Sequence, residues 1–330
     1  MLDTTVEALD RDKKSVITSN GEVKFDSLLI ASGATPRTLD VSGSDLNQVK
    51  TLRSLAQADE IIKVSENAEH VVLVGASFIA MEAAFSLNSR GKDVTVIAPE
   101  SIPFEQLFGQ DIGKLIQKQH EDKGIQFKLG HGVKKFNGNG SIESVTLDNG
   151  ENIETDLVIV GIGVKPATEF VSGLDMDDEG GIRVDSSFRA AENIYAAGDV
   201  ALFPFSLTGE SIRIEHWRTA EQQGRIAAIN MAGGKATYDS MPFFWTAQPN
   251  LKLGYVGHAR EWDDIIVDGS IEDKSFIAFF VKNNKVIAVA SSQRAQEFLS
   301  IEEHMRTGSM PKVEKLEGYD WLKNIQTAGK

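Results

Sequence analysis

The strongest constraint on the fold is a short pattern that occurs twice in the chain. It consists of an aspartate, six further residues, a glycine, two further residues and a proline, and it occupies Asp26–Pro36 and, 130 residues later, Asp156–Pro166. An Asn-Gly pair, typical of a tight turn, comes shortly before each copy. Each copy also contains an apolar run that predicts a buried core strand. The two copies predict a chain built from two related halves.

A strand, a glycine turn and a helix precede the second copy, in the order of a dinucleotide-binding unit. Such a turn lets backbone amides approach a pyrophosphate, and the helix N-terminus adds partial positive charge. Of the three glycines in Gly-x-Gly-x-x-Gly only Gly75 is present, because Ser77 and Ala80 stand at the other two positions. At the end of the second strand Ala98 replaces the acidic residue expected for the adenosine ribose, and Glu100 follows two places later. Taken alone, these residues also fit a βαβ unit that binds no nucleotide.

The first half contains no comparable glycine turn within this chain. Gly75 precedes Asp156 by 81 residues, and the same distance before Asp26 reaches roughly 55 residues upstream of Met1. We therefore expect the first phosphate-binding turn to belong to a longer form of the protein. Its absence would expose the apolar strand at Leu28–Ala31, which predicts a surface that aggregates or binds a partner.

Charge and composition disfavour several classes of function. The 330 residues carry a net charge of -14 with a pI near 5.0, which argues against nucleic acid or an anionic membrane as the main partner. Without cysteine the chain carries no disulfide, thiolate nucleophile or cysteine-ligated iron–sulfur cluster of its own. The histidines show no His-x3-His pairing, so we predict no metal site. Redox chemistry would need a bound organic cofactor.

The sequence gives little reason to expect a membrane or secreted protein. No apolar run approaches the roughly 18 to 20 residues that cross a bilayer, so we predict no membrane span. The first residues do not resemble a signal or transit peptide. We expect a cytoplasmic protein, with a mitochondrial location as the alternative because a targeting segment would precede Met1 in a longer form. The oligomeric state is left open.

Residue patterning predicts short strands and helices in an α/β arrangement. A small antiparallel meander at residues 6–25 leads into the first core strand. Helices are expected at Ser54–Ser65, from Gly75 to Arg90, at Gly109–Lys123 and at residues 216–232. Strand and turn patterns alternate after Met241 and give way to a polar tail. The strands expected there are Leu253–His258, Asp264–Val267, Ser275–Val281 and Val286–Ser291.

The most specific single motif is Tyr-Ala-Ala-Gly-Asp, which ends at Asp199. It places a carboxylate at a close-packed strand tip, where it can accept hydrogen bonds from ligand hydroxyl groups. Standing alone, it favours a helix cap or a turn residue. By the same reasoning Trp217 and Trp245 fit core aromatic residues, His216 fits a core histidine, and Glu82 fits a partner of the helix dipole.

In combination and order, these motifs resemble the FAD-dependent pyridine nucleotide oxidoreductase superfamily. Within it, the chain is similar to the branch of ferredoxin and rubredoxin reductases and apoptosis-inducing factors, most closely to proteins like apoptosis-inducing factor 3. The joint pattern is more specific than any one motif. Its parts are Leu28–Arg37, Gly75–Glu82, Tyr195–Asp199, Arg213–Trp217 with Gln223 and Gly224, and Pro242–Thr246.

The resemblance implies one site for FAD and one for NAD(P)H. Near FAD it implies, from the adenine and pyrophosphate side to the isoalloxazine, Ser32, Gly33, Arg37, Gly198, Asp199, Glu215, His216, Trp217 and Trp245. For the nicotinamide dinucleotide it implies Gly75, Ser77, Phe78, Glu82 and Gly163, with Phe78 and Glu82 where nicotinamide meets flavin. Among these residues we expect Glu82, His216 and Trp217 to be catalytic.

The implied fold is an α/β flavoprotein with two dinucleotide-binding domains, the first truncated at its N-terminus, and a C-terminal α+β domain. We predict a remnant of the FAD-binding domain at 1–48, an NAD(P)-binding domain at 49–165, a return segment of the FAD-binding domain at 166–240 and the C-terminal domain at 241–330.

The implied activity is hydride transfer from NAD(P)H to flavin, followed by electron transfer to an external acceptor. That acceptor would be a protein or a small molecule, with a Rieske-type iron–sulfur domain among the candidates. The absence of cysteine fits a branch that passes electrons outward without an internal disulfide. The alternative is a non-enzymatic or regulatory remnant that does not hold FAD, because the first glycine turn and the family lysine near the flavin are missing from this chain.

Overall fold

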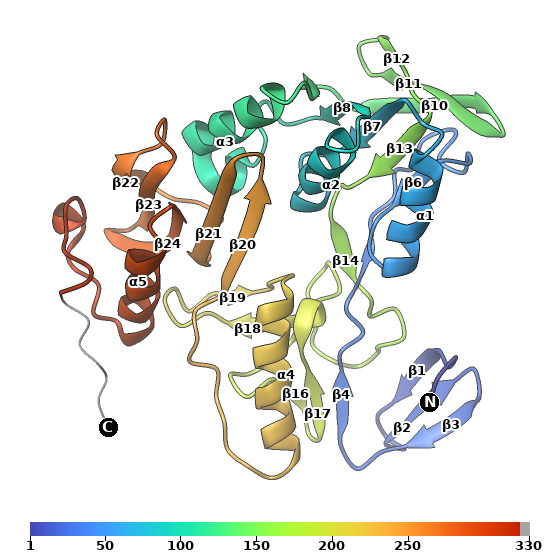
Figure 1. The fold of residues 1–330 in the computed structure, drawn as a ribbon. Helices are drawn as coiled ribbons and strands as arrows, with labels where there is room; N and C mark the ends of the chain where they lie inside the picture. Colours follow the sequence, from blue (N-terminus) through green and yellow to red (C-terminus); the bar gives the residue numbers. More distant parts are fainter. Residues whose placement is uncertain (324–330) are drawn as a thin grey trace. The chain divides into compact units, whose positions relative to one another are not determined.

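The computed structural model of the chain describes residues 1–323 (Figure 1). The chain forms two compact units. Unit 1 consists of Met1–Thr35 and Lys165–Phe244, and unit 2 consists of Pro36–Val164 and the chain from Trp245 onward. The predicted domain boundaries at residues 48, 165 and 240 stay predictions. None of the helices within residues 1–323 combines the length and the apolar character of a membrane span.

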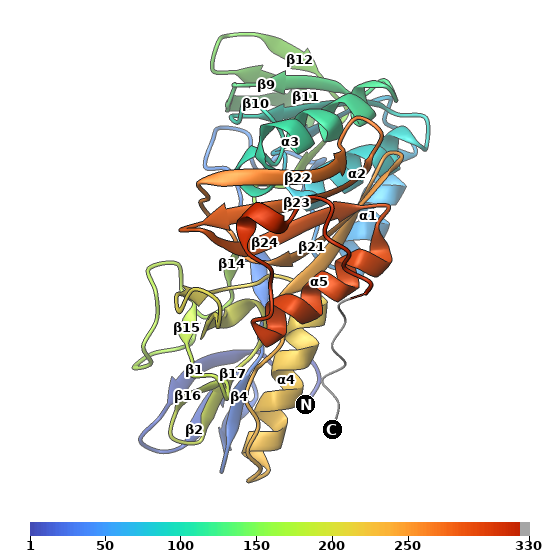
Figure 2. The ribbon, with the colours of Figure 1, turned by 90° about the vertical axis from the view of Figure 1, so that its left-hand side faces the viewer.

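A five-stranded parallel sheet is the centre of unit 2 (Figures 1 and 2). Its order is β6-β13-β7-β8-β9, so β13, the last of these strands along the chain, lies between β6 and β7. The strand order therefore changes direction beside β7, and sheets of this kind bind ligands outside the carboxyl ends of the strands at that point. The strands are β6 (Val49–Thr51), β7 (His70–Val74), β8 (Asp93–Ala98), β9 (Gln126–Leu129) and β13 (Leu157–Val160).

Three helices follow strands of this sheet, namely α1 (Leu55–Ser65), α2 (Phe78–Asn88) and α3 (Glu105–Glu121). Ser54 caps α1 in a capping box with Gln57, as expected for the predicted helix at Ser54–Ser65. The prediction of Gly109–Lys123 for α3 was wrong at its start, because the helix begins at Glu105. Gly109, with φ 76°, is a kink between two helical stretches. In sequence such a glycine looks like a helix boundary.

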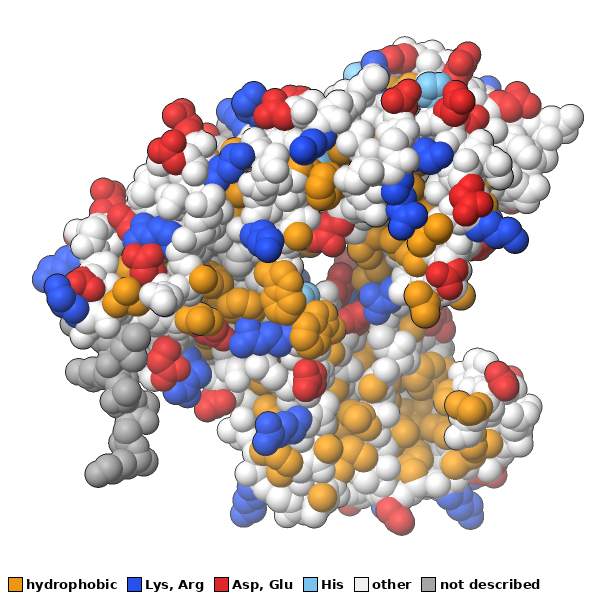
Figure 3. All heavy atoms as spheres, in the orientation of Figure 1, with side chains coloured by type: hydrophobic (Ala, Val, Ile, Leu, Met, Phe, Trp, Pro, Cys, Tyr) orange, Lys and Arg blue, Asp and Glu red, His pale blue; other side chains and the backbone are white. Residues whose placement is uncertain are grey.

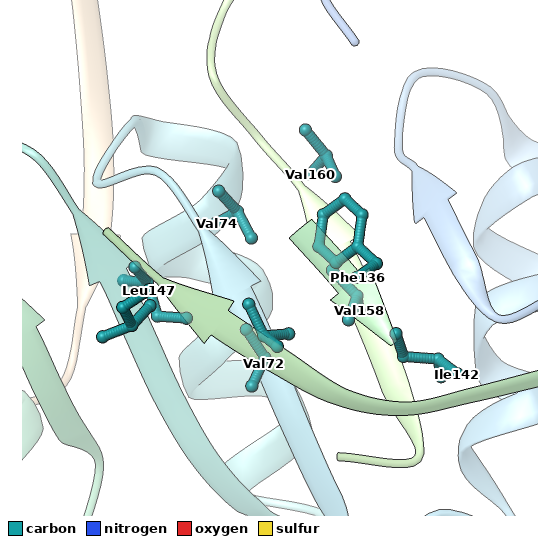
Figure 4. Packing of buried hydrophobic residues seen from close by; sticks show 9 residues of the cluster. Val72, Val74, Phe136, Ile142, Leu147, Val158 and Val160 are labelled. Carbon is teal, nitrogen blue, oxygen red and sulfur yellow. The ribbon is translucent and has the colours of Figure 1, made fainter. Parts of the chain in front are cut away.

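The core of unit 2 lies between the parallel sheet and an antiparallel meander (Figure 4). The meander consists of β10 (Val133–Asn139), β11 (Ser141–Leu147) and β12 (Asn152–Glu154). Every residue of β13 is buried, which explains its continuous apolar sequence. The buried residues of this core are Val72, Val74, Ile97, Phe136, Ile142, Val145, Leu147, Val158 and Val160.

The C-terminal region forms a second five-stranded sheet, in the order β20-β21-β24-β23-β22, and confirms the predicted α+β domain. Sequence patterning missed β20 and α5. The buried residues Phe298, Ile301 and Met305 of α5 have helical spacing and were the available signal. The elements are β20 (Phe243–Gln248), β21 (Leu251–Gly257), β22 (Asp264–Ser270), β23 (Ser275–Lys282), β24 (Lys285–Ser292), α5 (Ala295–Thr307) and the short helix η2 (Val313–Lys315).

Unit 1 contains three small sheets and one long helix. The predicted meander is present as β1 (Val6–Asp10), β2 (Ser15–Thr18) and β3 (Gly21–Lys24). A second sheet has the order β16-β17-β4, with β4 (Leu28–Ile30), β16 (Arg189–Ala191) and β17 (Ile194–Ala196). The remaining elements are β15 (Ile182–Arg183), β18 (Ala201–Pro204), β19 (Ser211–Ile212), the short helix η1 (Gly198–Val200) and α4 (Trp217–Met231).

The two copies of the repeated pattern contain β4 and β13, and these strands have different neighbours. β13 pairs with β6 on one side and β7 on the other, whereas β4 pairs with β17 and is an edge strand among the described residues. Asp156 accepts hydrogen bonds from the backbone amides of Glu69 and His70 at the start of β7, both at 2.9 Å, and these bonds lower its pKa. The corresponding Asp26 is exposed. Unit 1 thus has no described counterpart of β7, and Figure 3 shows hydrophobic side chains at the surface around β4 and α4.

The ends of the two copies form a strand pair of their own. Arg37 donates its backbone amide to the carbonyl oxygen of Gly163, and Ala167 donates its amide to the carbonyl oxygen of Gly33, both at 2.9 Å. These four residues stand at equivalent positions in the two copies, so the repeat is preserved in the hydrogen bonding. The paired strands are β5 (Ala34–Pro36) and β14 (Val164–Pro166).

Candidate functional site

The turn after β7 is built so closely against β13 that only glycine fits. Gly75 has φ +103°, and a Cβ atom there would lie 2.9 Å from the carbonyl carbon of Gly161 and closer still to its oxygen. A Cβ on Gly161 would in turn lie 2.9 Å from the Cβ of Ala80. The turn between β7 and α2 is therefore pressed against the end of β13, at the switch point of the sheet.

Ser77 stands at the second glycine position of the dinucleotide pattern. The structure gives its hydroxyl group two internal roles. As the N-cap of α2 it accepts a hydrogen bond from the amide of Ala80, at 3.4 Å, and it donates one to the carbonyl oxygen of Gly161, at 2.7 Å. The serine therefore links the N-terminus of α2 to the residue that follows β13.

A pocket of about 410 Å³ opens at this turn, outside the carboxyl ends of β7, β8 and β13. It brings together three of the predicted residues, Gly75, Ser77 and Gly163. Two acidic residues that follow β8, Glu100 and Glu105, also line it. The position and the start of α2 at its edge are those of a dinucleotide pyrophosphate site.

Phe78, the first residue of α2, belongs to an aromatic cluster. Its ring centroid lies 4.7 Å from that of Phe104 and 6.1 Å from that of Phe108, and Phe108 meets Tyr255 of the C-terminal sheet at 5.8 Å. Phe104 has a left-handed backbone with φ 58°, which is uncommon for a bulky residue and often found at functional sites. Phe104 also lines the 410 Å³ pocket. The cluster links the predicted nicotinamide residue to the C-terminal sheet.

Glu82 lies one turn further along α2 and faces a second pocket, of about 620 Å³, between α1 and α2. Its carboxylate accepts a hydrogen bond of 2.6 Å from the hydroxyl group of Thr246 on β20. Thr246 is buried and accepts a hydrogen bond of 2.7 Å from the side-chain amide of Gln248. This pocket also includes Arg53, which precedes the capping box of α1. Sequence analysis assigned no role to Thr246 or Arg53.

In unit 1 the predicted Gly198 and Asp199 lie in η1, and the Asp199 side chain is buried. The amide of Gly198, a residue with φ +81°, donates a hydrogen bond of 2.7 Å to the Oε1 atom of Gln223 on α4. The Nε2 atom of Gln223 and the Oγ1 atom of Thr219, one turn earlier on α4, are buried without a hydrogen-bond partner. Buried polar groups normally have partners, so these two atoms fit a polar ligand beside η1.

The start of α4 holds three further predicted residues. His216 is the N-cap, and its Nδ1 atom accepts a hydrogen bond of 3.3 Å from the amide of Arg218. Burial and the nearby guanidinium of Arg218 lower the pKa of His216, which favours the neutral, hydrogen-bond-accepting ring. Trp217 is 61% exposed. Glu215 forms an ion pair with Arg213, which also pairs with Glu179 at 2.9 Å.

Ser32, Gly33 and Arg37 form hydrogen bonds between the ends of the two repeat copies, and the last predicted residue, Trp245, lies on β20. Ser32 donates its hydroxyl hydrogen to the carbonyl oxygen of Ala167 at 2.6 Å, next to the bond that Gly33 accepts. The Nε atom of Arg37 donates to the carbonyl oxygen of Val164 at 3.1 Å. Trp245, on β20, is 49% exposed. The hydrogen bonds of Ser32 and Arg37 give these two residues a structural role whether or not a cofactor is bound.

Two family models match successive parts of the chain. Residues 1–224 match the model of the pyridine nucleotide-disulphide oxidoreductase family, and residues 243–320 match that of the reductase C-terminal domain. The chain belongs to the pyridine nucleotide-disulphide oxidoreductase family. This membership confirms the predicted resemblance and the predicted α/β fold.

Individual members of the family show how far the likeness extends. Apoptosis-inducing factor 3 of Homo sapiens is 34% identical over 286 residues, which are 85% of this chain and 47% of the human protein. Rhodocoxin reductase of Rhodococcus erythropolis is 30% identical, over 92% of this chain and 71% of that protein. A ferredoxin reductase structure from Rhodopseudomonas palustris matches with a TM-score of 0.89 and 29% identity, over 95% of this chain and 78% of that one. The chain spans about half the length of apoptosis-inducing factor 3.

Proteins of this family use FAD and NAD(P)H, as the sequence predicted. Unit 2 fits a nicotinamide dinucleotide, because its turn requires glycine at position 75 and opens into a pocket at a helix N-terminus. Unit 1 fits the ribityl end of FAD through the buried carboxylate of Asp199 and the unpartnered polar atoms of Thr219 and Gln223. A phosphate-binding glycine turn for FAD is not among the elements described in unit 1.

Proposed function

We propose that this chain is part of an FAD-dependent NAD(P)H oxidoreductase that takes a hydride from NAD(P)H and passes electrons to an external acceptor. The observation that carries this proposal is the glycine-only turn at Gly75, which opens into a pocket at the switch point of a parallel sheet. Family membership supports the same activity. The chain would then be a fragment or short isoform of a longer active protein.

Each unit would contribute a different group of residues. In unit 2 the N-terminus of α2 and the backbone around Gly75 would bind the pyrophosphate of the nicotinamide dinucleotide, and Phe78 would contact the nicotinamide. Thr246 would orient the carboxylate of Glu82 through their hydrogen bond. FAD, when bound, supplies the hydride-accepting and electron-passing chemistry.

In unit 1, Asp199 and the unpartnered groups of α4 would hold the ribityl chain of FAD, and Glu215, His216 and Trp217 would position its ring system. The lowered pKa of His216 keeps its imidazole neutral at pH 7, so its role would be to accept a hydrogen bond and not to supply positive charge.

The proposed acceptor is a small iron–sulfur protein of the ferredoxin or Rieske type. Relatives whose names describe such pairs include the ferredoxin reductase component of an anthranilate 1,2-dioxygenase system from Burkholderia cepacia. A putidaredoxin reductase, solved in a covalent complex with putidaredoxin, matches this chain with a TM-score of 0.86 and 28% identity. Reduction of a purified ferredoxin or Rieske protein by NADH in the presence of this chain and FAD would test the assignment.

Cofactor binding provides the direct test. The purified chain is titrated with FAD while flavin absorbance and fluorescence are recorded, and separately with NADH and NADPH. We expect both cofactors to bind, and Asp199→Asn to weaken FAD binding by about tenfold or more through loss of a charge-assisted hydrogen bond. Glu192→Gln, an exposed charge change in the same unit, is the control and should bind FAD as the parent does. A folded protein that does not bind FAD would exclude the proposal for this chain.

A second candidate function, a non-enzymatic remnant that holds no FAD, is favoured by one observation. Among the described residues β4 is an edge strand, and no described strand begins beside the exposed Asp26 as β7 does beside its counterpart Asp156. The FAD titration separates the two candidates. Binding of NADH without any binding of FAD would support the remnant.

A further inference from the structure

Two glutamates give the dinucleotide pocket of unit 2 an acidic wall. Of the residues that line this pocket, all of which lie within the described part of the chain, Glu100 and Glu105 are the charged ones, and neither lysine nor arginine is present. The pocket already contains the glycine turn to which a pyrophosphate would bind. The two carboxylates would therefore lie beside the part of the nucleotide that extends from this turn past the end of β8.

The backbone holds Glu100 in place just after β8. The carbonyl oxygen of Glu100 accepts a hydrogen bond from the amide of Gly130, at 3.0 Å, and that of Ala98 accepts one from His131, at 3.2 Å. These bonds tie the loop after β8 to the end of β9. Ala98, at the usual position of the ribose-binding acid, is fully buried and small. Glu100 is thus the first residue after β8 that can present a carboxylate to the pocket.

Glu105, the first residue of α3, has a carboxylate with two side-chain hydrogen-bond donors. It accepts hydrogen bonds from the hydroxyl group of Ser101, at 2.9 Å, and from the side-chain amide of Gln110, at 2.8 Å. A carboxylate held in this way cannot turn away from a negatively charged ligand without losing both bonds. It adds a second negative charge to the lining of the pocket, beside that of Glu100.

We propose that Glu100, supported by Glu105, makes this chain select NADH over NADPH. The inference rests on the proposed nicotinamide dinucleotide site. The adenosine ribose of NADH offers a 2′-hydroxyl group that can donate a hydrogen bond to the Glu100 carboxylate. NADPH carries at the same position a phosphate with about two negative charges, which the two carboxylates would repel and which no basic lining residue would neutralise.

The test is a comparison of dissociation constants for NADH and NADPH, measured by nicotinamide fluorescence on the purified chain, so that no flavin is needed. We expect the parent protein to bind NADH at least about tenfold more tightly, with a ratio that falls as salt is added because salt screens the repulsion. Glu100→Gln should bring the ratio near one, mainly by tightening NADPH. Glu100→Arg should reverse the preference. Glu154→Gln, an exposed charge change on β12 in the same unit, should leave the ratio unchanged.

The outcomes separate this inference from the proposed function. Equal binding of NADH and NADPH by the parent, or an unchanged ratio in Glu100→Gln, would overturn the inference and leave the dinucleotide site standing. Failure of the folded parent to bind either nucleotide would overturn both. Circular dichroism of each variant verifies that the fold is intact, and Glu105→Gln provides an independent variant, expected to lower the ratio by a smaller factor.

Discussion

Replacing Gly75 with alanine would show how strongly the close approach of β7 and β13 constrains the proposed dinucleotide site. The substitution has two costs. A left-handed backbone, with φ +103°, is unfavourable for alanine by about 1–2 kcal/mol. The new Cβ would also lie 2.9 Å from the carbonyl carbon of Gly161, and because backbone cannot yield like a flexible side chain, we add about 1–3 kcal/mol for this overlap. The expected loss of unfolding free energy is about 3 kcal/mol.

Gly91 provides a matched control at the other end of the same helix. It too has a positive φ, +81°, but a Cβ there would meet nothing within 4 Å. Gly91→Ala should therefore carry only the backbone cost, about 1 kcal/mol. The difference between the two variants measures the contact with Gly161.

Urea unfolding of both variants, combined with amide hydrogen exchange of β7 and β13, tests this reasoning. We expect the unfolding midpoint of Gly75→Ala to fall well below that of Gly91→Ala and exchange to accelerate in β7 and β13. We also expect Gly75→Ala to lose NADH affinity, because relief of the overlap would move the turn that forms the pocket. Equal midpoints for the two variants would refute the argument from close approach.

Three further predictions concern single side-chain contacts in unit 2. Thr246→Val should lower the unfolding free energy by about 1–2 kcal/mol, because it removes the hydroxyl group that bonds Glu82, while Thr246→Ser should retain most of it; urea midpoints compare the two. Burial lowers the pKa of His120, so the unfolded chain binds a proton more readily than the folded chain does. The melting temperature should therefore fall as pH drops below 6.5, and in His120→Gln it should depend less on pH in this range. Arg294→Met should lower the melting temperature of the C-terminal sheet by the equivalent of about 1–3 kcal/mol, because it leaves the partly buried carboxylate of Asp268 without its 2.9 Å ion pair.

Local sequence signals predicted the elements that depend mainly on neighbouring residues. Ser54 and Gln57 define the start of α1, and the continuous apolar run of β13 predicted a strand buried on both faces. Signals that depend on distant contacts gave errors. Gly109 looked like a helix start because the sequence does not reveal that α3 continues through a kink. Patterning also missed β20, whose residues served as a motif but not as a strand.

The residues of the candidate site likewise include some with a local sequence signal and others whose roles depend on distant contacts. Gly75 and Asp199 were recognisable because the neighbouring residues in the sequence mark a glycine at a turn and a Gly-Asp pair at the end of a strand. Roles for Thr246 and Gln223 were not predicted, because each depends on a partner far along the chain, Glu82 in one case and Gly198 in the other. In the sequence Ser77 is only a departure from the glycine pattern, and its hydrogen bond to Gly161 reveals that it links α2 to the end of β13.

The sequence alone determined that this chain consists of two related halves, because the two copies have the same residue types at the same spacing. Tertiary structure decided what each copy does. β13 inserts between β6 and β7, and Asp156 caps the start of β7, whereas β4 has a neighbour only on the side of β17 among the described residues. Strand pairing joins residues that are far apart in sequence, so identical spacing in two copies cannot specify which neighbours each strand has.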